Sequence, residues 1–302
     1  MIKKSDGLFF KQNSQFYKKK LIYYKFILFD FSNKQYIHYG DILFFIPLIT
    51  FLSKKFKIKI KVFEEDIDFI KIFLLDKIEI VTYIDDENYL TVTSPYCIDL
   101  INSSNSQVGI GLFQNRYSKP YPMVIIETFC NFFLVETSDN HIDKYYSIFL
   151  KKIRSKLCSV KSRTGNNNKN YFLVSPYLGS GRFRDFFGIK RVQILKFARS
   201  YSLANNLIIA VVGSSTDKKI NDKFDYIDLR GSNIIEIMSL VSTSNFVGGA
   251  GFDNFWMHYF DLINKHYYVK FRGRFLSINR HNHYNSINKS FFMNSKYQKD
   301  YI

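Results

Sequence analysis

Short apolar segments typical of buried strands alternate with helical patterns in both halves of the chain. The clearest is NLIIAVVGS at 206–214, a continuous run of the kind that is buried on both faces of a parallel sheet. LIYYKFILFDF at 21–31 predicts a strand, ILFFIPLITFLSKK at 42–55 a helix with a proline inside it, and KIKIKVFEE at 57–65 a second strand. Strand, helix and strand in this order begin a βαβ unit.

The second half repeats this order. YFLVSP at 171–176 predicts a strand, KRVQILKFARSYSLA at 190–204 a helix and YIDLRG at 226–231 another strand. Asn233 then stands where a helix N-cap is expected, and NFVGG at 245–249 predicts a strand that runs into glycines. We therefore expect an α/β protein with two Rossmann-like doubly wound domains that face a cleft, with ligands in that cleft.

The segment KSRTGNNNKN at 161–170 is polar, is rich in Asn and has no hydrophobic period. Such a segment is typical of a loop or a domain boundary. A chain of 302 residues is long enough for two domains of about 150 residues each. We therefore expect one domain at 1–160 and another at 171–302.

The chain is basic, with 43 Lys and Arg against 26 Asp and Glu, a net charge of +17. Residues 1–160 hold 22 basic and 17 acidic side chains, and residues 161–302 hold 21 and 9. This distribution favours an anionic ligand on the second half. AT-rich codon usage would also enrich lysine, so the composition alone does not identify a partner.

The three cysteines, Cys97, Cys130 and Cys158, have no metal-ligand spacing, which argues against a disulfide framework and favours a reducing compartment. The longest apolar run, 42–52, is far shorter than the roughly 20 residues of a membrane span. The N-terminus lacks the apolar core of a signal peptide. These features predict a cytoplasmic location.

A glycine and an aspartate, Gly40 and Asp41, follow the first predicted strand and precede the apolar helix. Asp41 has the position of a helix N-cap, and a capping role is the simpler interpretation. A carboxylate at the carboxyl edge of a parallel sheet also faces the ligand crevice, where it can act as a general base.

The loop SPYLGSGRFRDFFG at 175–188 has backbone N–H groups and two arginines that can hold phosphate. An ordinary surface loop is the alternative. A third motif, NFVGGAGFDNFWMHYFDL at 245–262, predicts a glycine-rich turn that enters a helix N-terminus, which favours anions. His258 in that motif is either a core histidine or a phosphate or acid–base contact.

In this order, GDILFFIPLITFL, SPYLGSGRFRDF, VGGAG and MHYFDL resemble the motifs of the lipopolysaccharide heptosyltransferases, glycosyltransferase family nine. The resemblance covers residues 21–62 and 171–270, roughly half of the chain. It implies the GT-B fold, with an acceptor-side domain at 1–160 and a nucleotide-sugar-binding domain at 171–302. It also implies an inverting, metal-independent transfer of a hexose or heptose from a nucleotide diphosphate sugar to a lipopolysaccharide, O-antigen or capsule acceptor.

The resemblance implies that Asp41 is the catalytic base. It also implies a set of residues that bind the donor: Gly179, Ser180, Gly181, Arg182, Arg184, Gly249, Gly251, Asn254 and His258. No metal site and no cofactor beyond the donor substrate are expected.

The basic tail at 264–302, which includes Lys265 and Lys270 with Tyr267 and Tyr268 between them, favours contact with the inner face of the cell membrane, where a lipid-linked acceptor lies. The alternative is that codon usage accounts for the lysines and that the tail packs across the cleft between the domains. A different class of function is a non-catalytic binding protein on the same fold that uses its basic face for nucleic acid or membrane. Nucleic acid is not expected, because most aromatic residues lie inside apolar runs.

Overall fold

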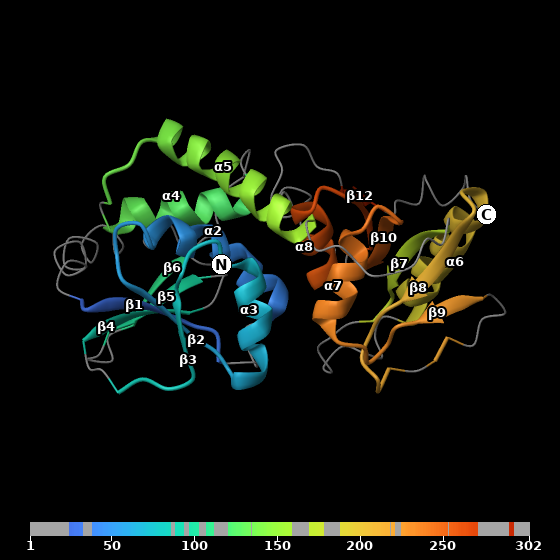
Figure 1. The fold of residues 1–302 in the computed structure, drawn as a ribbon, viewed down its shortest axis with the longest axis horizontal. Coiled ribbons are helices and arrows are strands. Elements are labelled where there is room, and N and C mark those ends of the chain that lie inside the picture. The colour runs from blue at the N-terminus through green and yellow to red at the C-terminus, as the bar shows by residue number, and fades with distance from the viewer. Residues whose placement is uncertain are drawn as a thin grey trace, which may run out of the picture. The chain divides into compact units, whose positions relative to one another are not determined.

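The computed structural model describes residues 24–32, 38–85, 88–93, 97–102, 107–111, 120–133, 135–158, 169–177, 188–217, 219–220, 225–252, 254–270 and 290–292. The chain divides into two compact units, Met1–Ile153 and Arg154–Ile302, and each has its own sheet (Figure 1). The division falls inside helix α5 (Asp139–Cys158), before the polar segment at 161–170. The last turn of α5 belongs to the second unit, where Arg154 Nε donates to Leu262 O at 2.7 Å.

The first sheet has six strands, and it is mixed. Its strands are β1 (Phe26–Asp30), β2 (Ile58–Lys61), β3 (Glu79–Val81), β4 (Tyr89–Thr93), β5 (Cys97–Asn102) and β6 (Gln107–Gly111). They lie in the order β3-β2-β1-β4-β5-β6. The four strands from β3 to β4 are parallel, whereas β5 and β6 continue the sheet as antiparallel neighbours. The parallel part has the βαβ order expected from the sequence.

Helix α2 (Tyr39–Leu52) is apolar on all sides, and every side chain from Ile42 to Leu52 is buried. A helix of this kind is a buried one. It contacts the sheet through Phe45 and Phe29, whose ring centroids are 6.0 Å apart. Pro47 lies in the interior of the helix and not in its first turn. On another side of the helix, the Tyr145 hydroxyl of α5 donates a hydrogen bond to Pro47 O at 2.8 Å. The remaining helices are η2 (Glu64–Asp66), α3 (Ile67–Phe73) and α4 (Tyr121–Phe133).

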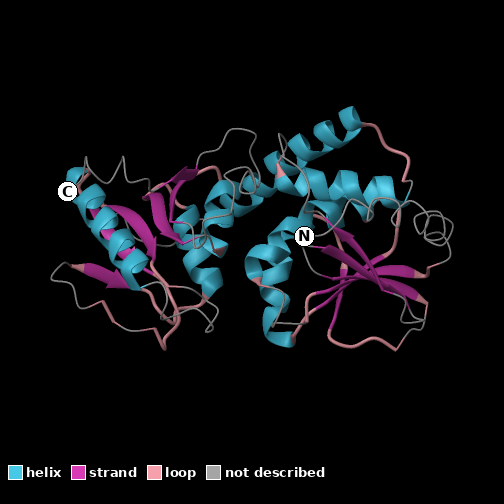
Figure 2. Ribbon diagram, turned by 180° about the vertical axis from the view of Figure 1, so that it is seen from behind, coloured by secondary structure: helices cyan, strands magenta, loops and turns pink. Residues whose placement is uncertain are grey.

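The second sheet also has six strands, and all of its pairs are parallel. Its strands are β7 (Asn170–Ser175), β8 (Leu207–Val211), β9 (Tyr226–Asp228), β10 (Phe246–Phe252), β11 (His266–Lys270) and β12 (Ser290–Phe292), in the order β12-β11-β10-β7-β8-β9. Figure 2 shows from behind that helices flank this sheet. Because β8 and β10 lie on opposite sides of β7, the order reverses between β7 and β10.

Helix α6 (Gly188–Ala204) covers one face of the second sheet, and its Ile194, Phe197 and Ala198 are buried against Val174 and Val211. Helices α7 (Ile234–Ser242) and α8 (Phe255–Leu262) pack on the other face (Figure 1). The predicted N-cap of α7 is confirmed, since Asn233 Oδ1 accepts from Ile235 N at 2.8 Å. Val192 of α6 is 47% exposed, so it is not part of the buried face of this helix.

The residues from 264 to 270, which begin the basic tail, pack into the second unit. Tyr267 is fully buried, and Tyr268 packs against the core under α6. Lys265 Nζ donates to Val241 O at 2.6 Å, to Phe246 O at 2.7 Å and to Thr243 O, so it caps the carboxyl end of α7. The rest of the predicted tail lies outside the described residues, apart from β12.

No helix within the described ranges is long and apolar enough to cross a membrane.

Candidate functional site

In an open parallel sheet, ligands bind outside the carboxyl ends of the strands, where the strand order reverses. In the second unit this point lies between β7 and β10. In the first unit it lies between β1 and β4. The predicted site residues that the structure describes follow β1 and β10 or lie within β10.

At the second unit's reversal point, Asn254 ties the start of α8 to the end of β7. Its Oδ1 accepts from Trp256 N at 3.0 Å, and its Nδ2 donates to Ser175 Oγ at 2.8 Å. Asn254 is therefore the N-cap of α8. The helix presents its positive end at this edge, which favours an anion. His258 lies one turn further along α8 and is half-buried. The predicted roles of Asn254 and His258 in donor binding stay predictions.

Gly249 and Gly251 are not in a turn, as the sequence had suggested, but inside strand β10. A Cβ on Gly249 would lie 3.0 Å from Leu173 O and 3.1 Å from the Phe260 ring. A Cβ on Gly251 would collide with Ser175 O and with the hydroxyl of Tyr267. Both glycines are needed for close packing of the sheet, and both are buried. Their backbone groups take part in the sheet, and their predicted role in donor binding stays a prediction.

The predicted phosphate-binding loop, with Gly179, Ser180, Gly181, Arg182 and Arg184, lies outside the described residues. The segments that flank it are described.

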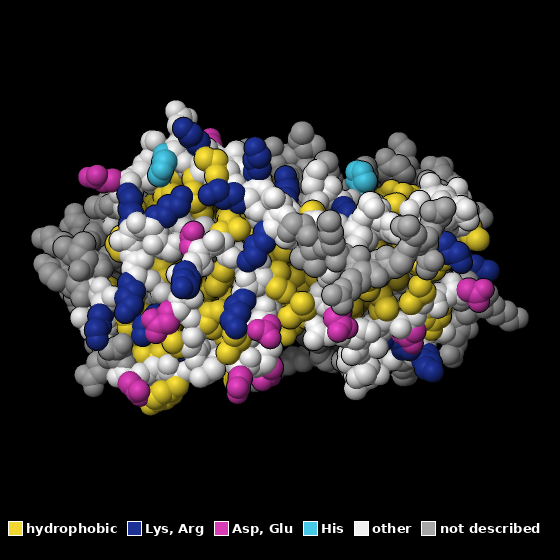
Figure 3. Space-filling view, viewed as in Figure 1, with side chains coloured by type: hydrophobic (Ala, Val, Ile, Leu, Met, Phe, Trp, Pro, Cys, Tyr) yellow, Lys and Arg dark blue, Asp and Glu magenta, His cyan; other side chains and the backbone are white. Residues whose placement is uncertain are grey.

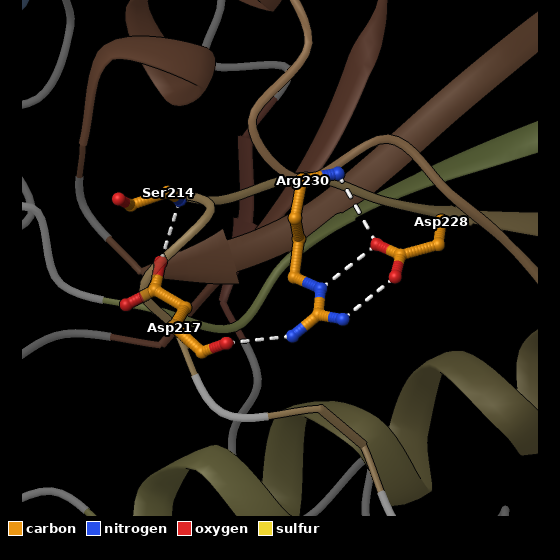
Figure 4. A network of polar contacts seen from close by, with 4 residues as sticks. All are labelled: Ser214, Asp217, Asp228 and Arg230. Carbon is orange, nitrogen blue, oxygen red and sulfur yellow. Dashed lines mark hydrogen bonds and ion pairs between the residues drawn. The ribbon is translucent and has the colours of Figure 1, made fainter.

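Beside the start of that loop, a polar network joins the segments that follow β8 and β9 (Figure 4). Arg230 donates from Nε and Nη2 to the two oxygens of Asp228, at 2.8 and 2.6 Å. Its Nη1 donates to Asp217 O at 2.7 Å, and Asp217 Oδ2 accepts from Ser214 N at 2.7 Å. The Arg230 side chain is only 6% exposed. The Arg230 side chain therefore connects the two segments, and these hydrogen bonds hold it in place.

The electrostatics of this edge are set by arginines. Arg230 holds the pKa of Asp228 down at about 2, chiefly through its side-chain hydrogen bonds. Burial raises the pKa of Tyr177, against the opposing effect of Arg230 and Arg191. The Arg191 guanidinium lies 5.9 Å from the centre of the Tyr177 ring. Tyr177 directly precedes the segment that contains Arg182 and Arg184, so Arg191 and Arg230 lie near the residue where that segment begins.

In the first unit, Asp41 belongs to the first turn of α2, after strand β1. The helix begins at Tyr39, and Ile42 N donates to His38 O at 3.1 Å. The N-cap position is therefore earlier than Asp41, and the interpretation of Asp41 as the cap is wrong. A carboxylate in the first turn still favours the helix dipole. Asp41 is placed at the carboxyl edge of the sheet, where a general base was predicted, and that role stays a prediction.

Two further carboxylates lie at the same edge. Tyr39 Oη donates to Asp66 Oδ1 at 2.6 Å, and the Asp66 side chain is buried. Burial, reinforced by the hydrogen bond to Asp66, raises the pKa of Tyr39. Asp30 accepts from Ser32 Oγ at 2.6 Å, and Lys61 Nζ lies 3.4 Å from its other oxygen. The Tyr39–Asp66 bond fixes the turn that carries Asp41 to the start of α3.

Among the described residues, no group of three or more His, Cys, Asp or Glu side chains could hold a metal ion.

Sequence reasoning missed the residues that organise the second unit's edge. Tyr177, Arg191 and Arg230 were given no role, although Arg230 lies near the end of the strand predicted at 226–231. That position was a usable signal, because an arginine at the carboxyl end of a parallel strand faces the binding edge. Nothing local links Asp66 to Tyr39, which lies 27 residues earlier.

Two α/β units with these strand orders make this a protein of the two-domain Rossmann-like class. No family model matches the sequence, and no curated protein matches it significantly. Among solved structures, a glycosyl transferase family 9 protein from Veillonella parvula DSM 2008 is similar, with a TM-score of 0.52 and 11% sequence identity. The similarity covers 92% of this chain and 88% of that one. It confirms the predicted fold class, the GT-B type of α/β fold.

Proposed function

We propose that the protein is a glycosyltransferase that moves a sugar from a nucleotide diphosphate donor to an acceptor hydroxyl. The observation that carries this proposal is the shared fold with a family 9 glycosyl transferase over 92% of the chain. The polar residues at the reversal point of each sheet support it, because both edges are places where such a fold binds ligands.

In the proposed reaction, the acceptor hydroxyl attacks the anomeric carbon of the donor from the side opposite the leaving diphosphate. The carboxylate of Asp41 takes the hydroxyl proton as the new glycosidic bond forms. The bond between the anomeric carbon and the phosphate oxygen breaks, and its electron pair leaves with the diphosphate. The transfer therefore inverts the anomeric configuration.

The leaving diphosphate gains negative charge, which the protein must stabilise. Arg182 and Arg184 are the proposed cations for this charge, and the N-terminus of α8 with Asn254 and His258 would supply a second contact. Fixed donors aimed at developing charge are the largest single contribution in many enzymes. We propose that these groups act without a metal ion, so excess EDTA should leave activity unchanged.

The proposed acceptor is a lipid-linked saccharide of the lipopolysaccharide, O-antigen or capsule type, and a heptose is among the candidate donor sugars. An acceptor of this kind would bring the protein to the cytoplasmic face of the cell membrane. The resemblance of the sequence motifs to the heptosyltransferases supports this part of the proposal.

The test is a screen of nucleotide diphosphate sugars for hydrolysis or transfer, preceded by calorimetric titration with nucleoside diphosphates. We expect one nucleoside diphosphate to bind at physiological salt and its sugar conjugate to turn over. Single-stranded DNA serves as the comparison ligand. DNA binding without any nucleoside diphosphate binding would overturn the proposal in favour of a non-catalytic binding protein.

A further inference from the structure

The outward face of α5 carries an unusual concentration of lysines. Lys144, Lys151 and Lys152 are exposed, and Ile148 between them is 46% exposed. Spacings of four, seven and eight residues place all four on one side of a helix, over about 12 Å of its length. From Lys144 to the end of α5 the sequence contains no acidic residue, and Asp143 is the last one before it. We call Lys144, Ile148, Lys151 and Lys152 the α5 face.

The lysines of the α5 face differ from others in the same unit. Several lysines of the first unit pair with carboxylates: Lys59 with Glu79, Lys61 with Asp30 and Lys71 with Asp68, at 3.1, 3.4 and 3.4 Å. Within the part of the chain that the structure describes, the three lysines of the α5 face take part in no ion pair. Their charge is therefore available to an external anion.

The end of α2 adds to this positive surface. Lys54 Nζ lies 4.8 Å from the centre of the Tyr145 ring of α5, and Lys55 Nζ donates to Glu136 O at 3.3 Å. Both lysines are exposed. Figure 3 shows Lys and Arg side chains over α5 and also across the rest of this face of the unit, with acidic side chains along its lower edge and a few at its upper edge.

We infer that the α5 face docks the protein on an anionic lipid surface. Lysines around an exposed aliphatic side chain suit a bilayer interface, because the ammonium groups meet the headgroups while Ile148 enters the acyl boundary. A single-stranded nucleic acid would need exposed aromatic rings for stacking. The aromatic residues of α5, which are Tyr145, Tyr146 and Phe149, are all buried.

This inference deepens the proposed function, on which it rests, since a lipid-linked acceptor requires the protein at a membrane. It moves the contact from the basic tail at 264–302 to the first unit. A lysine near an anionic surface contributes about 1 kcal/mol, which is about fivefold in a partition coefficient. Three lysines should together contribute about a hundredfold.

The test is co-sedimentation of the full chain with vesicles of equal parts phosphatidylglycerol and phosphatidylcholine, and with vesicles of phosphatidylcholine alone. We expect binding only to the anionic vesicles, with release at about 0.5 M salt. The variant Lys144→Gln, Lys151→Gln, Lys152→Gln should bind about a hundredfold more weakly. Ile148→Gln should weaken vesicle binding less than the triple variant does, and should leave the dependence of binding on salt unchanged.

The matched control replaces three exposed lysines that do not belong to α5, Lys71, Lys77 and Lys196, each by Gln, and so removes the same charge. This control should keep most of the vesicle binding. No binding by the parent protein, or equal losses in the two triple variants, would overturn the inference. Binding to single-stranded DNA in place of vesicles, with the same dependence on the α5 lysines, would also overturn it.

Nucleoside diphosphate titration of each variant separates this inference from the proposed function. Both triple variants should bind the nucleotide as the parent does. Vesicle binding without nucleotide binding would contradict the proposed function alone, and nucleotide binding without vesicle binding would contradict only the docking surface.

Discussion

The carboxyl edges of the two sheets differ in the charged groups that organise them. At the first edge, Asp30 and Asp66 are bonded to their neighbours, and the helical turn that contains Asp41 adjoins them. The second edge is organised by Arg230 and by the N-terminus of α8. A carboxylate suits proton removal from an acceptor, and a helix N-terminus suits a diphosphate. This difference is the basis of the proposal that the first unit supplies the base and the second binds the donor.

The variant Asp41→Asn tests most directly whether the first unit supplies the general base. Loss of a general base should lower the transfer rate by about 10² to 10⁴, because the amide cannot take the acceptor proton. Donor affinity, measured by titration with the nucleoside diphosphate, should stay unchanged. Thermal unfolding is the control: since Asp41 is not the N-cap, its loss should cost well under about 1 kcal/mol through the helix dipole. Turnover at the parent rate would exclude the role of base.

The second edge can be tested through the packing of β10. Gly251→Ala should lower the free energy of unfolding by about 3 kcal/mol, because its Cβ would meet the Ser175 carbonyl, which is fixed in the sheet. Gly248→Ala is the control on the same strand, since its Cβ would come no closer than 3.0 Å to His266 O. Urea unfolding should show the smaller loss for Gly248→Ala. A stable Gly251→Ala protein that loses only nucleotide binding would mean that the glycine serves the ligand.

The variants Arg182→Ala and Arg184→Ala test whether the second unit binds the diphosphate of the donor. If either arginine pairs with the diphosphate, nucleoside diphosphate affinity should fall by about 10- to 100-fold. Affinity for the nucleoside alone should change little, and calorimetry can measure both. Equal weakening of both ligands would indicate a misfolded loop.

Lys265 tests how the second unit is held together. Lys265→Met leaves three carbonyls without their donor and should cost about 1 kcal/mol at neutral pH. Burial lowers the pKa of Lys265 to about 8, below its usual 10.5. Between these values the unfolded chain holds a proton that the folded protein has released, so folding is favoured increasingly as pH rises. The free energy of unfolding of the parent, measured in urea, should therefore increase relative to that of Lys265→Met between pH 8 and pH 10.5. A decrease over this range would contradict the lowered pKa of Lys265.

The smallest effect is expected at Asp228. Arg230 lowers the pKa of Asp228 from 3.8 to about 2, so the pair stabilises the fold above the higher value and ceases to do so as pH falls toward the lower one. The Asp228 side chain is 40% exposed, which keeps the expected gain below about 1 kcal/mol. In acid unfolding, the difference between the parent and Asp228→Asn should vanish across this interval. A difference in the free energy of unfolding between the parent and Asp228→Asn that persists below pH 2 would mean that packing, and not the charge of Asp228, causes it.

Local sequence patterns predicted the helices and strands that consist of an uninterrupted or periodic run of apolar residues. The strands β1, β2, β7 and β8, the helices α2, α6 and α7, and the Asn233 cap follow from hydrophobic runs and cap residues that need no distant partner. The antiparallel strands β5 and β6 were not predicted. They belong to the region between 66 and 160, which the resemblance does not cover and in which no strand or helix was predicted.

The sequence by itself determined the fold class and which segments end at ligand-binding edges, because apolar periodicity decides burial and burial decides the layers. Only the tertiary structure decided what the polar residues at those edges touch. Asn254 reaches Ser175 across 79 residues, and Asp66 reaches Tyr39 across 27. Gly251 is required because Tyr267 and Ser175 fill the space beside it. Such requirements come from atoms that are distant in the chain and close in space, and no local pattern contains them.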